Sequence, residues 1–339
     1  FGADLYVTGE LVFTTAMTGY QELITDQAFS GQILSFTFPV IGAAGINRDD
    51  SESITPTCLA VVVQHLVEMP SNWRQQMTLD EFLNRKKIPG IVGIDTRQVA
   101  KIVRKYGRMK ATVINKGDSM RATVLPKDQV RQVSTKTAYA VPGFGKSIAL
   151  IDLGVKHSVL RQLSQRDCNV TVYPYDISYD ELMEQQPDGV ILSSGPGDPH
   201  QVKKLCRLIK KLNGQIPIWG MGLGAQLLAQ AYGAELAPME VGHFGLNIPV
   251  REIATGKIEI TSQNHLYSIA RDSLPHDLLV THENVNDHSI EAFRHRYQPI
   301  LGVQFQVDAS PGPRENLYFY DEFLELIDAK IHESRREKE

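Results

Sequence analysis

The sequence has little cysteine, and what it has does not suggest a disulfide framework. Its 339 residues include only Cys58, Cys168 and Cys206. An odd, sparse set of this kind favours a reducing, cytoplasmic setting. Cys206 lies on the apolar stripe of a predicted helix and Cys168 precedes an apolar run, so we expect both thiols to be packed rather than reactive.

Long apolar runs and an excess of charge are also missing. No run approaches the ~20 residues that cross a bilayer, and 35 Lys and Arg against 39 Asp and Glu leave a net charge of −4. We therefore expect neither a membrane nor a nucleic acid partner. There is no secretory signal, although the abrupt start at Phe1 suggests that residues precede it. No Cys or His ligand spacing occurs, so we predict no metal site.

The chain divides by pattern near residue 140. Residues 1–140 read as a mixed domain, with strands expected at 32–38 and 59–63 and helices at 79–84 and 97–105. Residues 141–146 read as a linker, residues 147–331 as a second domain and residues 332–339 as a charged, solvated tail. A phosphate loop is suggested by G-F-G-K-S at 143–147, but a strand rather than a helix follows, so we interpret it as a turn.

The second domain alternates between strands and helices. Apolar strands are expected at 147–153, 170–174, 189–193 and 216–219, and helices at 158–166, 179–186, 201–212 and 225–232, with a last helix at 315–331. Continuous apolar strands between helices indicate a parallel sheet covered on both faces. In such a sheet the chemistry gathers at the carboxyl ends of the strands. Two of these ends are rich in glycine, at 193–199 and 220–224.

The segment 216–232 reads as a strand, a sharp turn and a helix. This is the nucleophile-elbow arrangement, in which the turn holds one side chain above the sheet at a helix N-terminus. The helix end and nearby amides can stabilise a developing negative charge. The residue at the turn is Gly222, which has no side chain to present.

Class I glutamine amidotransferases carry G-x-C-x-G-x-Q at this elbow and Q-F-H-P-E further along. This chain is similar to them at 220–226, which reads G-M-G-L-G-A-Q, and at 304–308, which reads Q-F-Q-V-D. The resemblance places Gly222, Gln306 and Asp308 where the family has its cysteine nucleophile, histidine base and orienting glutamate.

Nearly the whole chain resembles the small chain of carbamoyl-phosphate synthase. The matching motifs lie at 17–22, 70–74, 93–97, 133–136, 151–156, 194–199, 263–265 and 309–313. The N-terminal motifs matter most, because other class I amidotransferases lack that domain. The resemblance implies an α/β fold: a C-terminal flavodoxin-like amidotransferase domain, with an open, mostly parallel sheet and helices on both faces, and an N-terminal mixed α/β domain.

The resemblance also implies a glutamine pocket. The amides of Gly195 and Leu223 match those that hold the oxyanion, and Gly197, Gln226 and Asn264 match positions that hold glutamine. Other positions depart from the family. Leu266 replaces the usual glycine, Tyr267 keeps the usual aromatic, and Ala28 replaces a serine that offers its hydroxyl to the substrate.

Glutamine hydrolysis by this route needs a thiolate, a proton-moving imidazole and a carboxylate that orients it. Gly222 cannot form a thioester, and the amide of Gln306 cannot relay a proton. We therefore expect no glutaminase activity. His243 or His265 as a substitute base, and Ser193 or Ser194 as a substitute nucleophile, stay open as weaker alternatives.

The family implies the partner and its cofactors. The large chain of such a synthase makes carbamoyl phosphate from bicarbonate, ammonia and ATP, for arginine or pyrimidine synthesis. We expect ATP and Mg²⁺ on that chain and no cofactor on this one, which would brace its partner in an ammonia-dependent complex. The alternatives are an active glutaminase with unorthodox residues, a non-catalytic glutamine or metabolite binding module, and a purely structural flavodoxin-like protein.

Overall fold

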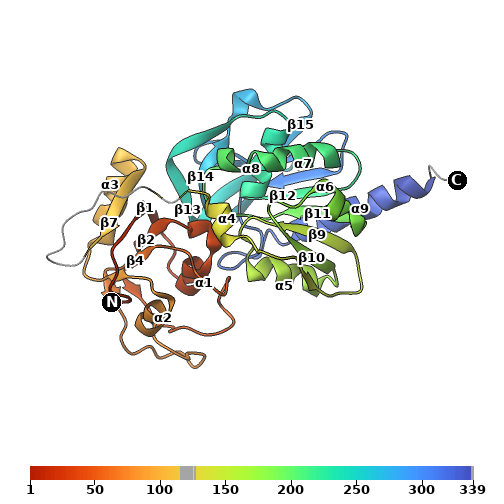
Figure 1. Ribbon diagram of the computed structural model, residues 1–339. Coiled ribbons are helices and arrows are strands. Elements are labelled where there is room, and N and C mark those ends of the chain that lie inside the picture. The colour runs from red at the N-terminus through yellow and green to blue at the C-terminus, as the bar shows by residue number, and fades with distance from the viewer. Residues whose placement is uncertain (115–124, 126, 337–339) are drawn as a thin grey trace.

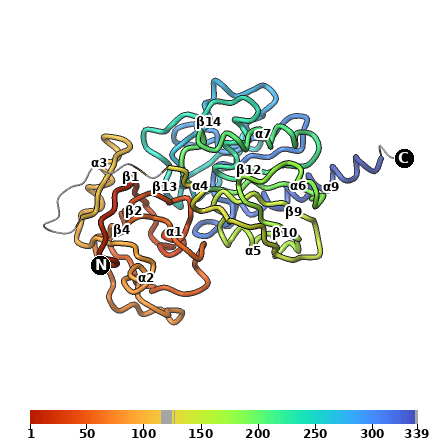
Figure 2. Tube along the Cα trace, in the orientation of Figure 1, coloured from red at the N-terminus to blue at the C-terminus, as the bar shows by residue number. Residues whose placement is uncertain are grey.

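The protein has two lobes that lie side by side. They are seen in a computed structural model that describes residues 1–114, 125 and 127–336. The N-terminal lobe, red to orange in Figures 1 and 2, packs against the β13 and α5 side of the larger C-terminal lobe. None of the helices in the described part of the chain is long and apolar enough to cross a membrane.

The N-terminal lobe is built on a five-stranded mixed sheet. Its strand order is β6-β4-β2-β1-β7, with β7 antiparallel to β1 and the other neighbours parallel. A separate two-stranded sheet pairs β3 with β5. The elements are β1 (Val7–Thr14), α1 (Tyr20–Thr25), η1 (Gln27–Phe29), β2 (Gln32–Phe36), β3 (Val40–Ile41), β4 (Ala60–Val62), β5 (His65–Leu66), α2 (Leu79–Lys86), β6 (Gly90–Ile91), α3 (Thr96–Tyr106), β7 (Met109–Val113) and α4 (Gln129–Val133).

The C-terminal lobe holds a ten-stranded sheet in the order β14-β13-β15-β16-β17-β12-β11-β9-β10-β8. The strands from β17 to β10 run parallel in the middle, and the strands outside them are antiparallel. The elements are β8 (Tyr139–Val141), β9 (Ser147–Asp152), α5 (His157–Gln165), β10 (Asn169–Pro174), α6 (Tyr179–Glu184), β11 (Gly189–Leu192), η2 (Pro199–Val202), α7 (Lys204–Leu212), β12 (Ile218–Met221), α8 (Leu223–Ala231), β13 (Leu236–Glu252), β14 (Ile258–Ile269), η3 (Arg271–Ser273), β15 (Leu278–Asn284), β16 (Ile290–His295), β17 (Ile300–Val303) and α9 (Tyr318–Arg336).

Helices cover both faces of the parallel strands. One core joins the strands to α6, α7 and α8, and a second joins them to α5 and α9. β11 and β12 are buried along their whole lengths, as expected for strands between two helical layers. Trp219 of β12 packs edge-on against Tyr320 of α9, with ring centroids 5.0 Å apart. The predicted fold class is confirmed, with an antiparallel extension added to the parallel centre.

The boundaries of three predicted helices are wrong. The helix expected at 201–212 is split: Asp198 caps a short 3₁₀ turn that begins at Pro199, and α7 starts at Lys204. The helix after the elbow begins at Leu223 rather than Ala225, because Gly222 is its N-cap. The last helix begins at Tyr318 and continues to Arg336, through residues expected to be a tail, supported by the Lys330–Glu333 pair one turn apart.

Candidate functional site

The elbow has the expected strand–turn–helix geometry. β12 ends at Met221 and α8 starts at Leu223, with Gly222 between them at φ 52° and ψ −114°. This conformation lies outside the left-handed helical region that other residues tolerate, so glycine is favoured here. The Gly222 amide donates to the Val303 carbonyl of β17 at 2.8 Å, which fixes the turn over the centre of the sheet.

One cavity between the lobes collects the residues that the sequence placed at the degenerate catalytic positions and in the glutamine pocket, although the alternatives Ser193 and His243 do not line it. It opens above the elbow, and Gln32, Ser194, Phe244, His265 and Gln304 also contribute to its walls. The predicted residues that line it are Ala28, Gly195, Gly197, Gly222, Leu223, Gln226, Asn264, Leu266, Tyr267, Gln306 and Asp308. Their proximity agrees with a single pocket, and their individual roles stay predictions.

The pocket retains unpaired hydrogen-bond donors. Among the described residues, the backbone amides of Gly195 and Leu223 have no backbone acceptor. The side-chain nitrogens of Asn264 and Gln304 are buried and have no partner either. Buried donors without acceptors are costly. All four residues line the cavity, so the free amides of Gly195 and Leu223 are available to an oxygen-bearing ligand there.

Gln306, at the position of the family's histidine, is hydrogen-bonded to residues outside the elbow. Nε2 of Gln306 donates to Asp26 Oδ2 of the N-terminal lobe at 2.8 Å. Its Oε1 accepts from Ser262 Oγ at 3.2 Å and lies 3.4 Å from Lys156 Nζ. With both ends engaged and no basic nitrogen, Gln306 crosslinks the lobes and cannot move a proton.

The carboxylate at the glutamate position is held by a buried lysine. Lys156 Nζ is 2.6 Å from Asp308 Oδ2 and also donates to the Ser310 carbonyl, and both charged side chains are nearly or fully buried. Ser158 Oγ donates to the same carboxylate oxygen at 2.6 Å. Burial opposes the charge on Lys156, but Asp308, Asp26 and Glu52 outweigh it and raise the pKa of the amine. Asp308 thus forms a structural ion pair.

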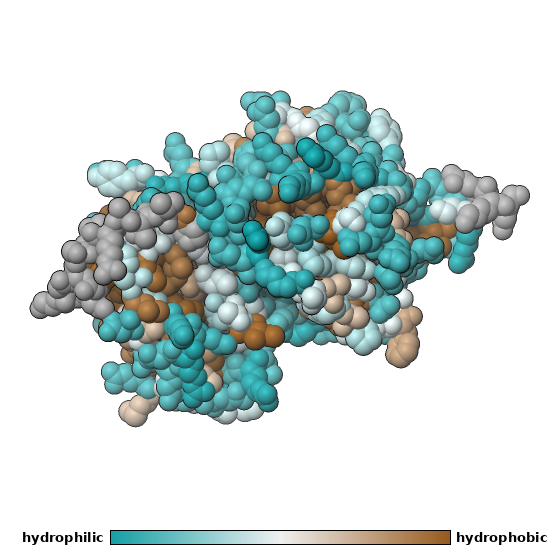
Figure 3. Space-filling view, viewed as in Figure 1, coloured by the Kyte–Doolittle hydropathy of each residue, from teal (hydrophilic) through white to brown (hydrophobic). Residues whose placement is uncertain are grey.

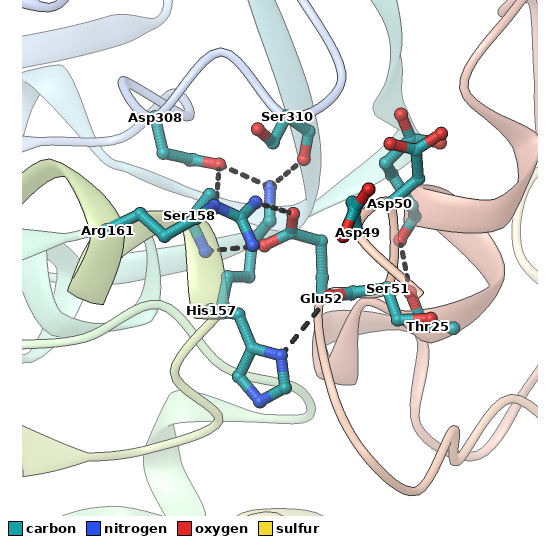
Figure 4. A network of polar contacts seen from close by, with 12 residues as sticks. Thr25, Asp49, Asp50, Ser51, Glu52, His157, Ser158, Arg161, Asp308 and Ser310 are labelled. Carbon is teal, nitrogen blue, oxygen red and sulfur yellow. Dashed lines mark hydrogen bonds and ion pairs between the residues drawn. The ribbon is translucent and has the colours of Figure 1, made fainter. Parts of the chain in front are cut away.

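Next to this pair the lobes meet through Glu52. Its carboxylate, fully buried, accepts from the Ser158 amide and from Arg161, each at 2.8 Å. Its carbonyl accepts from the His157 amide at 3.0 Å. Figure 4 shows this loop of the N-terminal lobe reaching the start of α5 just below Asp308. We name Asp26, Glu52, Lys156, Gln306 and Asp308 the interlobe clasp.

The weaker candidates for catalysis are poorly placed. Ser193 is buried and its hydroxyl is bonded to the Leu153 amide and the Ser194 carbonyl. Ser194 lines the cavity, beside the elbow. His265 lines the cavity too, but burial lowers its pKa to about 3. Burial opposes protonation of His243 as well, yet hydrogen bonds to Asp287 and Glu291 raise its pKa to about 9, so neither imidazole suits general base catalysis near neutral pH.

Comparison with known proteins assigns both lobes. Residues 1–113 match the family described as carbamoyl-phosphate synthase small chain, CPSase domain, and residues 149–326 match glutamine amidotransferase class-I. A carbamoyl phosphate synthase small chain of Streptococcus mutans is 57% identical over 336 residues, which cover 97% of this chain and 93% of the relative. One from Streptococcus pneumoniae is 56% identical over 335 residues. The chain belongs to the carbamoyl-phosphate synthase small-chain family.

A solved structure supports the fold of the amidotransferase lobe alone. It is a candidate GMP synthase component from Thermoplasma acidophilum, 21% identical, with a TM-score of 0.51. The match covers 57% of this small chain and 98% of that protein. At this identity the likeness shows the fold and carries no conclusion about substrate.

The interlobe clasp contains the residues that sequence reasoning missed. Lys156 lies in a motif that identified the small-chain family, but nothing in the motif predicted that its ammonium would be buried against Asp308. Asp26 and Glu52 carried no signal, because their partners lie more than a hundred residues away.

In this small chain Gly222→Cys should lower stability. A Cβ at position 222 would lie 3.1 Å from Ser194 Cβ, and the backbone there strains any other residue. We expect a loss of about 1–3 kcal/mol in the free energy of unfolding, measured by urea denaturation. Gly256→Ala is the control for a positive φ without crowding, because Gly256 has φ 75° with open space around it, and it should cost less than Gly222→Cys. A Gly222→Cys protein as stable as the wild type would contradict the predicted backbone strain at position 222.

Proposed function

We propose that this chain is a glutaminase-deficient small subunit that braces a carbamoyl-phosphate synthase large chain and leaves that enzyme dependent on free ammonia. The observation that carries the proposal is the elbow itself. Gly222 has the backbone geometry of a nucleophile position but no nucleophile, and the two partner positions serve the interlobe clasp. Because position 222 has no nucleophilic side-chain atom, a covalent glutamyl intermediate cannot form there.

Support for a partner comes from the family and from the surface. The relatives named above are small chains, which implies a large one, and ATP and Mg²⁺ would bind there. Figure 3 shows a mainly hydrophilic face with separate brown patches on both lobes. Several large apolar side chains of the N-terminal lobe are exposed, including Met69 and Trp73, whose relative exposures are 88% and 89%. Exposed apolar groups of this size fit an interface better than open solvent.

A paired assay of the two-subunit complex tests the proposal. The small chain is purified with its large chain, and carbamoyl phosphate formation is measured with ATP, bicarbonate and either glutamine or ammonium. We expect synthesis with ammonium and a rate with glutamine at least about 1000-fold lower, since only binding and amide contacts remain to assist hydrolysis. Equal rates with the two nitrogen donors would refute the proposal.

The unpaired donors in the cavity favour a second candidate, a module that binds glutamine or a similar amide without turnover. Asn264 and Gln304 each present a buried nitrogen without an acceptor. The side chains of Ala28 and Leu266 argue against tight binding, because the first offers no hydroxyl and the second adds bulk. Calorimetry with glutamine separates the candidates: saturable heat with no glutamate formed supports the module.

A further inference from the structure

Two histidines and a glutamate meet at the wall of the cavity, to which His265 itself contributes. The antiparallel pairing of β13 with β14 sets His243 opposite His265, and their rings lie edge-on with centroids 4.9 Å apart. Glu291 comes from β16. One ring nitrogen of each histidine and one carboxylate oxygen of Glu291 all lie within 4.8 Å of one another. Gln263 Oε1 lies between the rings, 2.7 Å from His243 Nδ1 and 3.1 Å from His265 Nε2.

The outer hydrogen bonds of the two rings point their remaining nitrogens at this centre. His243 Nε2 is 2.9 Å from Asp287 Oδ2, and His265 Nδ1 is 2.9 Å from the Tyr267 carbonyl. Both outer partners are acceptors, so both outer nitrogens carry hydrogen. This is the support that metal-binding histidines receive, a carboxylate for one ring and a backbone carbonyl for the other.

The centre therefore holds too many acceptors. With its Nδ1 protonated, a neutral His265 presents a lone pair at Nε2 that faces the carbonyl oxygen of Gln263. Glu291 Oε1 adds a negative charge 3.5 Å from His243 Nδ1. A proton on His243 Nδ1 can serve Gln263 Oε1, but the contact between Gln263 Oε1 and His265 Nε2 then has no hydrogen. Ser289 Oγ and Asn284 Nδ2 donate to Glu291 Oε1 at 3.1 and 3.4 Å. The second oxygen of this fully buried carboxylate has no hydrogen-bond partner among the described residues, so it remains open to a ligand.

We propose that His243 Nδ1, His265 Nε2 and Glu291 bind a divalent transition metal, with Zn²⁺ as the best match, and that Gln263 Oε1 lies within reach as a fourth ligand. Tetrahedral Zn²⁺ with nitrogen ligands at about 2.0–2.1 Å sets its ligands about 3.3 Å apart. The His243–Glu291 separation of 3.5 Å already fits, and the longest separation in the set needs to shorten by roughly 1.5 Å to match.

The metal would be structural and would act on the cavity from behind. It would tie β13, β14 and β16 together one residue away from Asn264 and Leu266, which line the cavity in front. The sequence could not suggest this site, because its two histidines and its glutamate are more than twenty residues apart and only the sheet pairing joins them. The proposal does not depend on the role of the chain in carbamoyl phosphate synthesis.

Zinc titration of the whole chain tests the proposal. The protein is stripped with a chelator and titrated with Zn²⁺ against a chromophoric competitor. We expect one equivalent to bind with a dissociation constant of about 1 µM or tighter. Glu291→Gln keeps the side-chain shape and removes the charge, and should weaken binding by about 100-fold or more. His276→Gln is the control, because the side chain of His276 is exposed at the surface, and it should bind as the wild type does.

Cobalt reports the coordination geometry of the bound ion directly. Co²⁺ bound to the wild-type chain should show the intense visible bands of a tetrahedral ion, and His243→Gln should abolish them. Absence of a stoichiometric zinc site, a weak octahedral cobalt spectrum, or Glu291→Gln binding as tightly as the wild type would each overturn the proposal. If Glu291→Gln fails to fold, the wild-type cobalt spectrum and His243→Gln decide the outcome.

Discussion

Replacing Lys156 with methionine should destabilise the protein by about 3–5 kcal/mol, the usual cost of removing one partner from a buried ion pair. The amine of Lys156 has no exposed surface and lies 2.6 Å from Asp308. It also lies close enough to Asp26 and Glu52 for their charges to raise its pKa. Methionine fills a similar volume but leaves Asp308 and Asp26 without this cation, whereas Glu52 keeps Arg161. The free energy of unfolding from urea denaturation checks the result.

The matched control is Lys330→Met. Lys330 pairs with Glu333 on the surface of α9, at 2.9 Å. Exposed pairs are worth about 0–1 kcal/mol, so this variant should remain close to the wild type. If Lys156→Met lowers the free energy of unfolding no more than Lys330→Met does, the ion pair between Lys156 and Asp308 does not stabilise the protein as proposed.

Restoring both missing groups should restore measurable chemistry, whereas restoring one should not. Gly222→Cys alone provides a thiol at the N-terminus of α8 but no base, and Gln306→His alone provides a base but no nucleophile. The double variant should hydrolyse glutamine at least about 100-fold faster than either single variant, since a positioned base contributes ~10²–10⁴. Glutamate formation under saturating glutamine measures the effect.

Full family activity is not expected from the double variant. Asp308 stays bound to Lys156 and Ser158, so it is a poor partner for an imidazole at position 306. Ala28 and Leu266 still limit substrate binding. A Gly222→Cys variant as active as the double variant would contradict the view that the missing base is limiting.

The pocket was predictable from sequence because its residues belong to turns and strand ends with fixed spacing. The elbow at Gly222 and the turn at Gly195 follow neighbouring strands of a parallel sheet. Both must therefore lie at the carboxyl end of that sheet, and this placement could be predicted once the strands were recognised. Helix ends were less predictable. The capping role of Gly222 moved the start of α8, and residues with exposed charged side chains still extended α9 to Arg336.

The interlobe clasp and the histidine pair were beyond sequence reasoning for a different reason. The hydrogen bond between Gln306 and Asp26 spans 280 residues, and no local period or motif encodes it. The facing of His243 and His265 depends on the register of β13 and β14, which contains irregularities on either side of His243. The first contact depends on how the two lobes pack, and the second depends on strand pairing within the C-terminal lobe.

A glutaminase measurement on the purified chain, alone and bound to its large chain, tests the central claim most directly. Glutamate formation is followed with saturating glutamine, and intact-mass spectrometry is used to look for a glutamyl adduct. The absence of both glutamate above the uncatalysed rate and any adduct is the predicted result. Turnover of glutamine by either preparation, or a trapped adduct on this polypeptide, would contradict the account.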